Sequence, residues 1–262
     1  MSWTTIHYKQ ENNGVAWVTL CRPKERNAMS SLMFEELNQL LPQLEADTAI
    51  RAVVLTGEGK AFCAGGDLAE MKAGYGGNAG FYHHMESANR CAAALLELGK
   101  PVVAAVNGAA TGAGINLALA ADLAIAAENA KFSEIFGNVG LLPDLGGTWL
   151  LPRLVGRAKA KELIYSYRMV DAQEALSLGL VNQIVPLEKL HDTAAHLAEQ
   201  LAQGPTFAFS MAKRLINRCY ETDLHTALQM EALAQSLAAN SQDHQEGVRA
   251  FFEKRPPHFR GN

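Results

Sequence analysis

The sequence predicts an α/β fold, in which a core of alternating strands and helices is followed by a helical C-terminal region. Short apolar, β-branched runs bounded by Gly, Pro or Asp are typical of buried strands, and they occur at residues 14–20, 52–57, 101–108 and 122–127. Between them, residues 31–46 and 83–98 carry apolar side chains at helical spacing. Strands that alternate with helices indicate crossover connections within one layered domain.

The second part of the chain looks different, because strand-like patterns fade after about residue 157. The segments beyond it have helical periodicity, and several open on Asp, Pro or Thr, which can cap a helix. A helical tail of this length has little interior of its own, so we expect it to pack on the core or on a neighbouring subunit. The Gly-rich residues 73–81 are expected to form a mobile loop.

Composition excludes several classes of function. The chain of 262 residues has a net charge of −4 and no basic block, which argues against binding of nucleic acid. Four scattered cysteines without a CxxC pair indicate neither a disulfide framework nor a zinc knuckle. Adjacent His83 and His84 would point in different directions on a helix, so no metal site is expected. No signal peptide, membrane-length apolar stretch or peroxisomal address is evident, and a cytoplasmic protein is expected.

Two glycine-rich loops follow predicted strands. The first is KAFCAGGDL at residues 60–68, and the second is VNGAATGAGINLALAADL at 106–123, where a helix of small residues should open near Gly112. Glycines allow close approach of the backbone to a ligand, and amides at a helix start favour negative charge. Such amides could bind a phosphate or stabilise the oxygen of an enolate. Tight packing of a helix on a sheet would explain either loop equally well.

The segment LLPDLGGTW, residues 141–149, places Asp144 in an apolar setting before a predicted helix. Locally, an aspartate in this position is more often a helix cap than a catalytic group. No GxSxG or Cys/His pattern supplies a nucleophile elsewhere in the chain. Asp144 is therefore the acid that remains as a candidate for chemistry.

Taken in order, these segments resemble the crotonase, or enoyl-CoA hydratase/isomerase, superfamily over essentially the whole chain. The motifs that carry the resemblance are LCRPKERNAMS, KAFCAGGDL, KPVVAAVNGAATGAG, GLLPDLGGTWLLPRLVG, GLVNQIVP and FFEKRPPHF. The resemblance implies a spiral of ββα units (the ClpP-like fold) in residues 1–200. It also implies a helical region in residues 201–262 that closes the pocket and builds a homotrimer or a dimer of trimers.

The resemblance also implies an acyl-CoA thioester as the ligand, with no separate cofactor. The two amides that stabilise the thioester enolate fall on Gly66 and Ala113 by position. Residues implied to contact CoA are Arg22 and Lys24 near the phosphates, Ala64, Asp67 and Leu68 along the adenine, and Lys254 and Phe259 reaching the CoA of a neighbouring subunit.

This chain departs from the hydratases of the family at the two positions where they carry glutamates. Those positions hold Asn116 and Phe136, neither of which exchanges a proton at neutral pH. Glu134 is close in sequence, but its side chain is expected to point in another direction. A subset of the family, which includes the 1,2-epoxyphenylacetyl-CoA isomerases, keeps an aspartate at the position of Asp144 in a very similar context. This resemblance favours a catalytic Asp144 over a cap.

The predicted activity is isomerisation of an acyl-CoA, in which Asp144 moves a proton during a double-bond shift or assists the isomerisation of an epoxide to an oxepin. Asn116 either lines the acyl pocket or orients a polar ring substituent of the substrate, or it is satisfied within the helix start. An enoyl-CoA hydratase that uses Asp144 or Glu134 with a bound water is the alternative. A non-catalytic relative that binds acyl-CoA or RNA is a further reading, against which the lack of a basic face counts.

Overall fold

The large sheet of the molecule has six strands in the order β1-β2-β3-β5-β7-β10. The computed structural model describes residues 3–262. Only β1 is antiparallel to its neighbour; the other strands run parallel. The strands are β1 Ile6–Gln10, β2 Val15–Leu20, β3 Ala52–Gly57, β5 Val102–Val106, β7 Leu123–Ala127 and β10 Gln183–Val185. The four strands predicted from the sequence are confirmed as β2, β3, β5 and β7.

A smaller sheet has four short strands in the order β4-β6-β8-β9, the last pair antiparallel. These strands are β4 Ala61–Cys63, β6 Ala109–Thr111, β8 Lys131–Ser133 and β9 Val170–Asp171. The chain passes from the large sheet to the small sheet and then into a helix, and it repeats this path along β3–β4, β5–β6 and β7–β8. The expected spiral of ββα units is therefore present.

Alternate residues of the large sheet enter two separate cores. Val53 and Leu55 of β3 face the larger core, which also contains apolar residues of α1 (Ser31–Ala46) and α3 (Asn78–Glu97). Ala52 and Val54 face the smaller core, to which α8 (Leu187–Ala202) contributes Leu190 and three alanines. This alternation follows from the two-residue period of a strand, and it explains why strands covered on both faces are almost wholly apolar.

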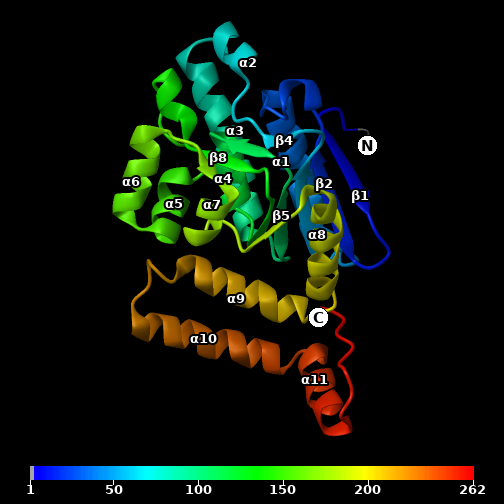
Figure 1. Ribbon diagram of the computed structural model, residues 1–262. Coiled ribbons are helices and arrows are strands. Elements are labelled where there is room, and N and C mark those ends of the chain that lie inside the picture. The colour runs from blue at the N-terminus through cyan, green and yellow to red at the C-terminus, as the bar shows by residue number, and fades with distance from the viewer. Residues whose placement is uncertain (1–2) are drawn as a thin grey trace.

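The remaining helices surround the small sheet or form the C-terminal region. Those near the small sheet are the 3₁₀ helices η1 (Pro23–Glu25) and η2 (Ile135–Val139) and the α-helices α2 (Leu68–Ala73), α4 (Ala113–Leu119), α5 (Gly147–Val155), α6 (Arg157–Ser166) and α7 (Ala172–Ser177). The last three helices are α9 (Thr206–Arg218), α10 (Leu224–Ala239) and α11 (Gln242–Glu253). In Figure 1, α9 runs beneath the body of the molecule, and α10 and α11 lie farther out. No helix within residues 3–262 has the length and apolar character to cross a bilayer.

Two expectations about secondary structure are corrected. The Gly-rich segment 73–81 is not one loop, because α2 ends at Ala73 and α3 already begins at Asn78. Gly74 ends α2 with a positive φ of 83°, and Gly77 precedes α3 with a φ of 87°, so the glycines serve as helix boundaries. Strands also continue beyond residue 157, since β9 and β10 lie there; with two and three residues, they are too short for periodicity to reveal.

Candidate active site

The two glycine-rich loops meet where β4 and β6 lie side by side in the small sheet. Gly65 has a φ of 100°, and a Cβ placed on it would lie 3.6 Å from the amide nitrogen of Ala113 and 2.9 Å from the carbonyl oxygen of Thr111. Gly114 is equally constrained, because a Cβ there would lie 2.2 Å from the carbonyl oxygen of Cys63. Glycine at both positions thus allows α4 to begin against the first loop.

The predicted enolate-stabilising amides, those of Gly66 and Ala113, belong to these two loops. Ala113 is the first residue of α4, and Gly112 before it has φ 55° and ψ −125°, a conformation that favours glycine. Neither N–H has a hydrogen-bond acceptor within the part of the chain that the structure describes. Unpaired amides at a helix start carry partial positive charge, so this junction can bind a negatively charged oxygen.

Asp144 lies in the loop between η2 and α5, and its side chain does not cap the helix. The residue that caps α5 is Gly146, while the backbone carbonyl of Asp144 accepts a hydrogen bond from Gly147 N at 2.8 Å. One carboxylate oxygen, Oδ1, is buried without a hydrogen-bond partner among the described residues. Burial raises the pKa of Asp144 to about 7. The carboxyl group can therefore both accept and return a proton near neutral pH.

Asn116 and Glu134 are buried beside the Asp144 loop. The Asn116 side-chain amide donates to the Asp144 backbone carbonyl at 3.0 Å and to Glu134 Oε2 at 3.4 Å. Glu134 is only 2% exposed, and its Oε1 has no partner in the described part of the chain. Burial and the neighbouring Asp144 charge raise the pKa of Glu134 to about 8, although the hydrogen bond from Asn116 opposes this shift. The expectation that Glu134 points away from this region is therefore wrong.

Asn116 lies with its side chain next to the candidate acid. Its side chain is fully buried, and its Oδ1 has no partner within residues 3–262. A Cβ on Gly147 would lie 2.3 Å from Asn116 Nδ2, so the start of α5 packs directly on this amide. Phe136 is also buried, and its Cζ would lie 3.8 Å from a Cβ on Gly112. Phe136 thus forms an apolar wall beside the start of α4.

Tyr75 was not selected from the sequence. Its hydroxyl is buried without a partner among the described residues. Burial, followed by the charges of Glu70, Asp67 and Asp144, raises the pKa of Tyr75 to about 12. Its ring packs 4.3 Å from that of His84, centroid to centroid. The Gly-Tyr-Gly-Gly context predicted only a flexible loop, and no sequence pattern indicated that the tyrosine would turn inward.

Of the residues implied to contact CoA near the first loop, Arg22 and Asp67 are in direct contact. Arg22 forms an ion pair of 2.7 Å with Asp67, which also accepts hydrogen bonds from two amides at the start of α2. These contacts outweigh burial and hold the pKa of Asp67 below its usual range. Leu68 is 65% exposed directly after Asp67, Ala64 is half-buried and Lys24 is exposed in η1. The exposed leucine provides an apolar surface, whereas the Asp67 carboxylate is already engaged.

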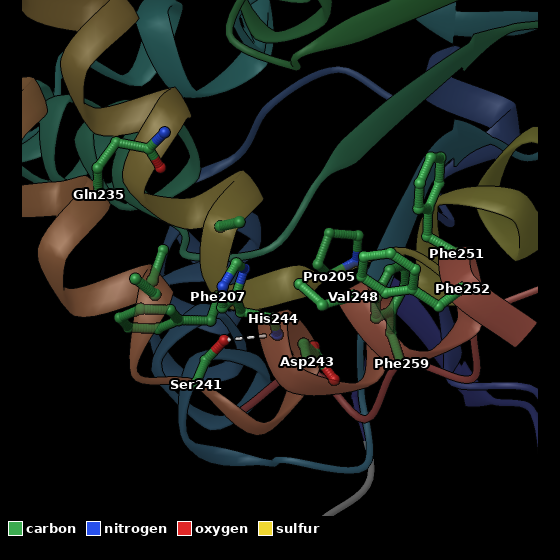
Figure 2. A pocket seen from close by; sticks show the side chains of 14 residues that line it. Pro205, Phe207, Gln235, Ser241, Asp243, His244, Val248, Phe251, Phe252 and Phe259 are labelled. Atoms are coloured by element: carbon green, nitrogen blue, oxygen red, sulfur yellow. Dashed lines mark hydrogen bonds between the residues drawn. The ribbon is translucent and has the colours of Figure 1, made fainter.

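Lys254 and Phe259 lie in the C-terminal region rather than beside the two loops. Lys254 ends α11 with a φ of 54°, and Phe259 lies in the segment that follows. Figure 2 shows Phe259 in an apolar pocket with Phe207 and Val248, at the junction of α9, α10 and α11. In Figure 1, α11 lies at the opposite end of the molecule from α2. Within one chain these two residues are therefore separate from the candidate site.

Comparison with known proteins agrees with this geometry. The family model described as enoyl-CoA hydratase/isomerase matches residues 10–262. The 1,2-epoxyphenylacetyl-CoA isomerase of Escherichia coli (strain K12) is 43% identical over 95% of each chain. The short-chain-enoyl-CoA hydratase of Clostridium acetobutylicum is 38% identical over 94% of each chain. The solved structure of enoyl-CoA hydratase from Bacillus anthracis superposes with a TM-score of 0.93 at 39% identity, covering 99% of this chain and all of that one.

The chain is thus an α/β spiral protein with a two-amide junction and a nearby half-buried acid. It belongs to the enoyl-CoA hydratase/isomerase family and has the crotonase fold. The names of its relatives include both isomerases and hydratases, so membership defines the class of enzyme and leaves the reaction to the residues of the site.

Proposed function

We propose that this protein is an acyl-CoA isomerase that acts through a thioester enolate, with Asp144 as the group that moves the proton. The observation that carries the proposal is the Asp144 carboxyl, whose Oδ1 is buried without a partner among residues 3–262 and whose pKa is raised to about 7. Gly66 and Ala113 supply the two amides that donate hydrogen bonds to the thioester oxygen. The 43% identity to an acyl-CoA isomerase supports the assignment.

For a 3-enoyl thioester, the reaction needs one proton-carrying group. The Asp144 carboxylate removes a proton from C2, and the electron pair of that C–H bond moves toward the thioester oxygen. The two amides stabilise the resulting enolate; one such donor contributes about 3–4 kcal/mol to a transition state. Asp144 then returns the proton to C4, and the double bond is left between C2 and C3. No water is gained or lost.

We propose a ring-containing phenylacetyl-CoA-type epoxide as the second substrate class of the same site. There the amides would stabilise the same thioester oxygen while the C–O bond migrates and the ring expands to an oxepin. The buried Tyr75 hydroxyl supports this assignment, because it has no partner among the described residues and the Asp144 charge contributes to its raised pKa. Such a donor can bind an oxygen on the ring. The similar isomerase of Escherichia coli is named for an epoxide of this type.

Hydration of a trans-2-enoyl-CoA is the second candidate function, and Glu134 is the observation that favours it. The Asn116 amide contacts both the Glu134 carboxylate and the Asp144 backbone, and the Asp144 charge acts on Glu134. Two carboxyl groups in this region can serve as the acid and the base that hydration requires. The pKa values of Glu134 and Asp144 are raised to about 8 and about 7. Between these pH values the two carboxyl groups together carry one proton. The short-chain-enoyl-CoA hydratase relative is consistent with this reading.

Mass spectrometry of the products distinguishes the two reactions. The protein is incubated separately with trans-3-enoyl-CoA and with crotonyl-CoA. Isomerisation predicts a new product of unchanged mass from the first substrate and little gain of water by the second. Asp144→Asn should lower the rate by about 10²- to 10⁴-fold, the usual contribution of a general base. Asp192→Asn, at an exposed site on α8, is the matched control and should leave the rate unchanged.

Two results would overturn the assignment. Full isomerase activity in Asp144→Asn would remove the proposed proton carrier. Efficient addition of water to crotonyl-CoA by the wild-type protein, abolished in Glu134→Gln, would assign hydration instead.

The proposed enzyme needs no cofactor beyond the CoA of its substrate, and we place it in the cytoplasm as a homotrimer or a dimer of trimers. Exposed apolar side chains on the C-terminal helices support the assembly, because such surfaces are usually covered by a partner. These side chains are Ile216, Leu224, Leu228, Leu233, Leu237, Phe251 and Phe252. In such an assembly residues 201–262 would join the subunits, and Lys254 and Phe259 would approach a neighbouring CoA.

A further inference from the structure

A cluster of three potential metal ligands lies at the edge of the large sheet, apart from the two-amide junction. Cys21 Sγ lies 3.3 Å from His7 Nε2 and 2.6 Å from Glu58 Oε2, and all three ligand atoms lie within 4.8 Å of one another. We propose that His7, Cys21 and Glu58 form a binding site for a zinc ion. The site uses residues far apart in the sequence, which explains why cysteine spacing predicted no metal.

The backbone holds the three positions next to one another. His7 is on β1, Cys21 directly follows β2 and Glu58 directly follows β3, three strands that are neighbours in the sheet. The amide of Cys21 donates to the carbonyl of Thr5 at 2.7 Å, and the amide of Glu58 donates to the carbonyl of Leu20 at 2.9 Å. The Cα positions are therefore fixed by the sheet, and only the side chains need to adjust to a metal.

The types of ligand atom in this cluster, and their combined charge, suit a zinc ion. Thiolate, imidazole and carboxylate are the three ligand types that zinc uses in proteins, and three protein ligands leave a fourth position for water. Zinc–ligand bonds of about 2.0–2.3 Å in a tetrahedron need ligand atoms about 3.3–3.7 Å apart. The Sγ–Nε2 separation already satisfies this requirement, while Sγ and Oε2 must separate by about 1 Å. A thiolate and a carboxylate would together neutralise the charge of the ion.

Binding replaces a hydrogen bond with a metal bond. In the metal-free protein, burial and the adjacent Glu58 raise the pKa of the Cys21 thiol to about 11, and the thiol donates its hydrogen to the Glu58 carboxylate. When zinc binds, the S–H bond breaks, the proton passes to solvent, and the sulfur and carboxylate electron pairs bind the ion. No oxidant or reductant takes part. The bound ion would link β1 to the residues that follow β2 and β3. Cys21 directly precedes Arg22, which forms the ion pair with Asp67.

Cobalt substitution tests the ligand set directly. The full-length protein is stripped with a chelator and titrated with Co²⁺, which produces a thiolate-to-metal charge-transfer band when a cysteine binds it. The wild type should show the band at one ion per chain, and Zn²⁺ should displace it and raise the melting temperature. Cys21→Ser should lose the band and the zinc-dependent shift in melting temperature. His7→Gln and Glu58→Gln should each weaken zinc binding at least tenfold.

Cys219 provides the matched control, because it is exposed and lies outside the cluster. Cys219→Ser should retain the full cobalt band and the zinc-dependent stabilisation. Loss of the band in this variant, or wild-type zinc content in Cys21→Ser, would overturn the proposal. A wild-type protein that retains no zinc after equilibrium dialysis at micromolar free metal would overturn it as well. Melting curves without metal separate these outcomes from misfolding.

Discussion

Replacing Ala113 with proline tests whether the amide at the start of α4 stabilises the enolate. Proline removes the N–H and is well tolerated at the first position of a helix, where that N–H has no partner within the helix. The preceding Gly112, with φ 55° and ψ −125°, has the mirror image of the extended conformation that residues before proline prefer. The substitution should therefore remove the donor while preserving α4.

The expected effect follows from the number of donors. In the proposed mechanism two amides donate to the thioester oxygen, and loss of one leaves only that of Gly66. One donor contributes about 2.7–4 kcal/mol, so kcat should fall by about 10²- to 10³-fold. The affinity for a saturated acyl-CoA, which forms no enolate, should change by only a few fold. Steady-state kinetics with trans-3-enoyl-CoA and calorimetric titration with butyryl-CoA measure these two quantities.

Ala172→Pro is the matched control, since Ala172 is the first residue of α7 and follows the extended Asp171. It should retain the wild-type rate. If Ala113→Pro retains more than a tenth of the wild-type kcat, the amide does not stabilise the enolate, and the assignment of Ala113 fails. A parallel loss of melting temperature in Ala113→Pro alone would instead show that α4 had been disrupted, and an amide-to-ester replacement at this position would then decide the question.

Three further predictions concern stability, each measured by urea unfolding. Gly114→Ala should destabilise the protein by about 1–3 kcal/mol, because its Cβ would lie 2.2 Å from the Cys63 carbonyl oxygen; an unchanged free energy of unfolding would refute this packing. The pKa of Glu134 is raised to about 8 in the folded protein, so the folded state binds a proton that the unfolded state releases, and the free energy of unfolding should fall as pH rises from about 4.5 through 8. Glu134→Gln should remove that part of the pH dependence. Parallel stability–pH curves for the variant and the wild type would contradict this prediction. Arg22→Met should cost on the order of 3 kcal/mol, because it leaves the Asp67 carboxylate buried without its cation, whereas the double variant with Asp67→Asn should recover part of the loss.

The sequence predicted the large sheet and the start of α4 well, for a clear physical reason. β2, β3, β5 and β7 are five or six residues long and buried on both faces, so each is a continuous apolar run between polar or glycine boundaries. The strands of the small sheet, two or three residues long, have no comparable pattern. They are specified by pairing with strands distant in the sequence, which local periodicity cannot reveal.

The candidate site was predictable in its backbone and less so in its side chains. Glycine loops after strands indicated where the backbone could approach a ligand, whereas Gly66 and Ala113 followed from the family resemblance and stay a prediction. The sequence placed Asp144 in an apolar setting, and burial is the cause of its raised pKa. The position of Glu134 was not predictable from counting residues. It directly follows β8 and precedes η2, and the change from strand to 3₁₀ helix sets the direction of its side chain.

The adjacency of β4 and β6 has a consequence for how this enzyme can change its substrate. The two amides belong to loops that follow β4 and β6, which are neighbours in the small sheet, so the pairing of these strands holds the two loops next to each other. Tyr75 and the start of α3, by contrast, lie on a glycine-bounded segment outside both sheets. Under the proposed function, that segment can change to fit another acyl group while the pairing of β4 and β6 stays the same.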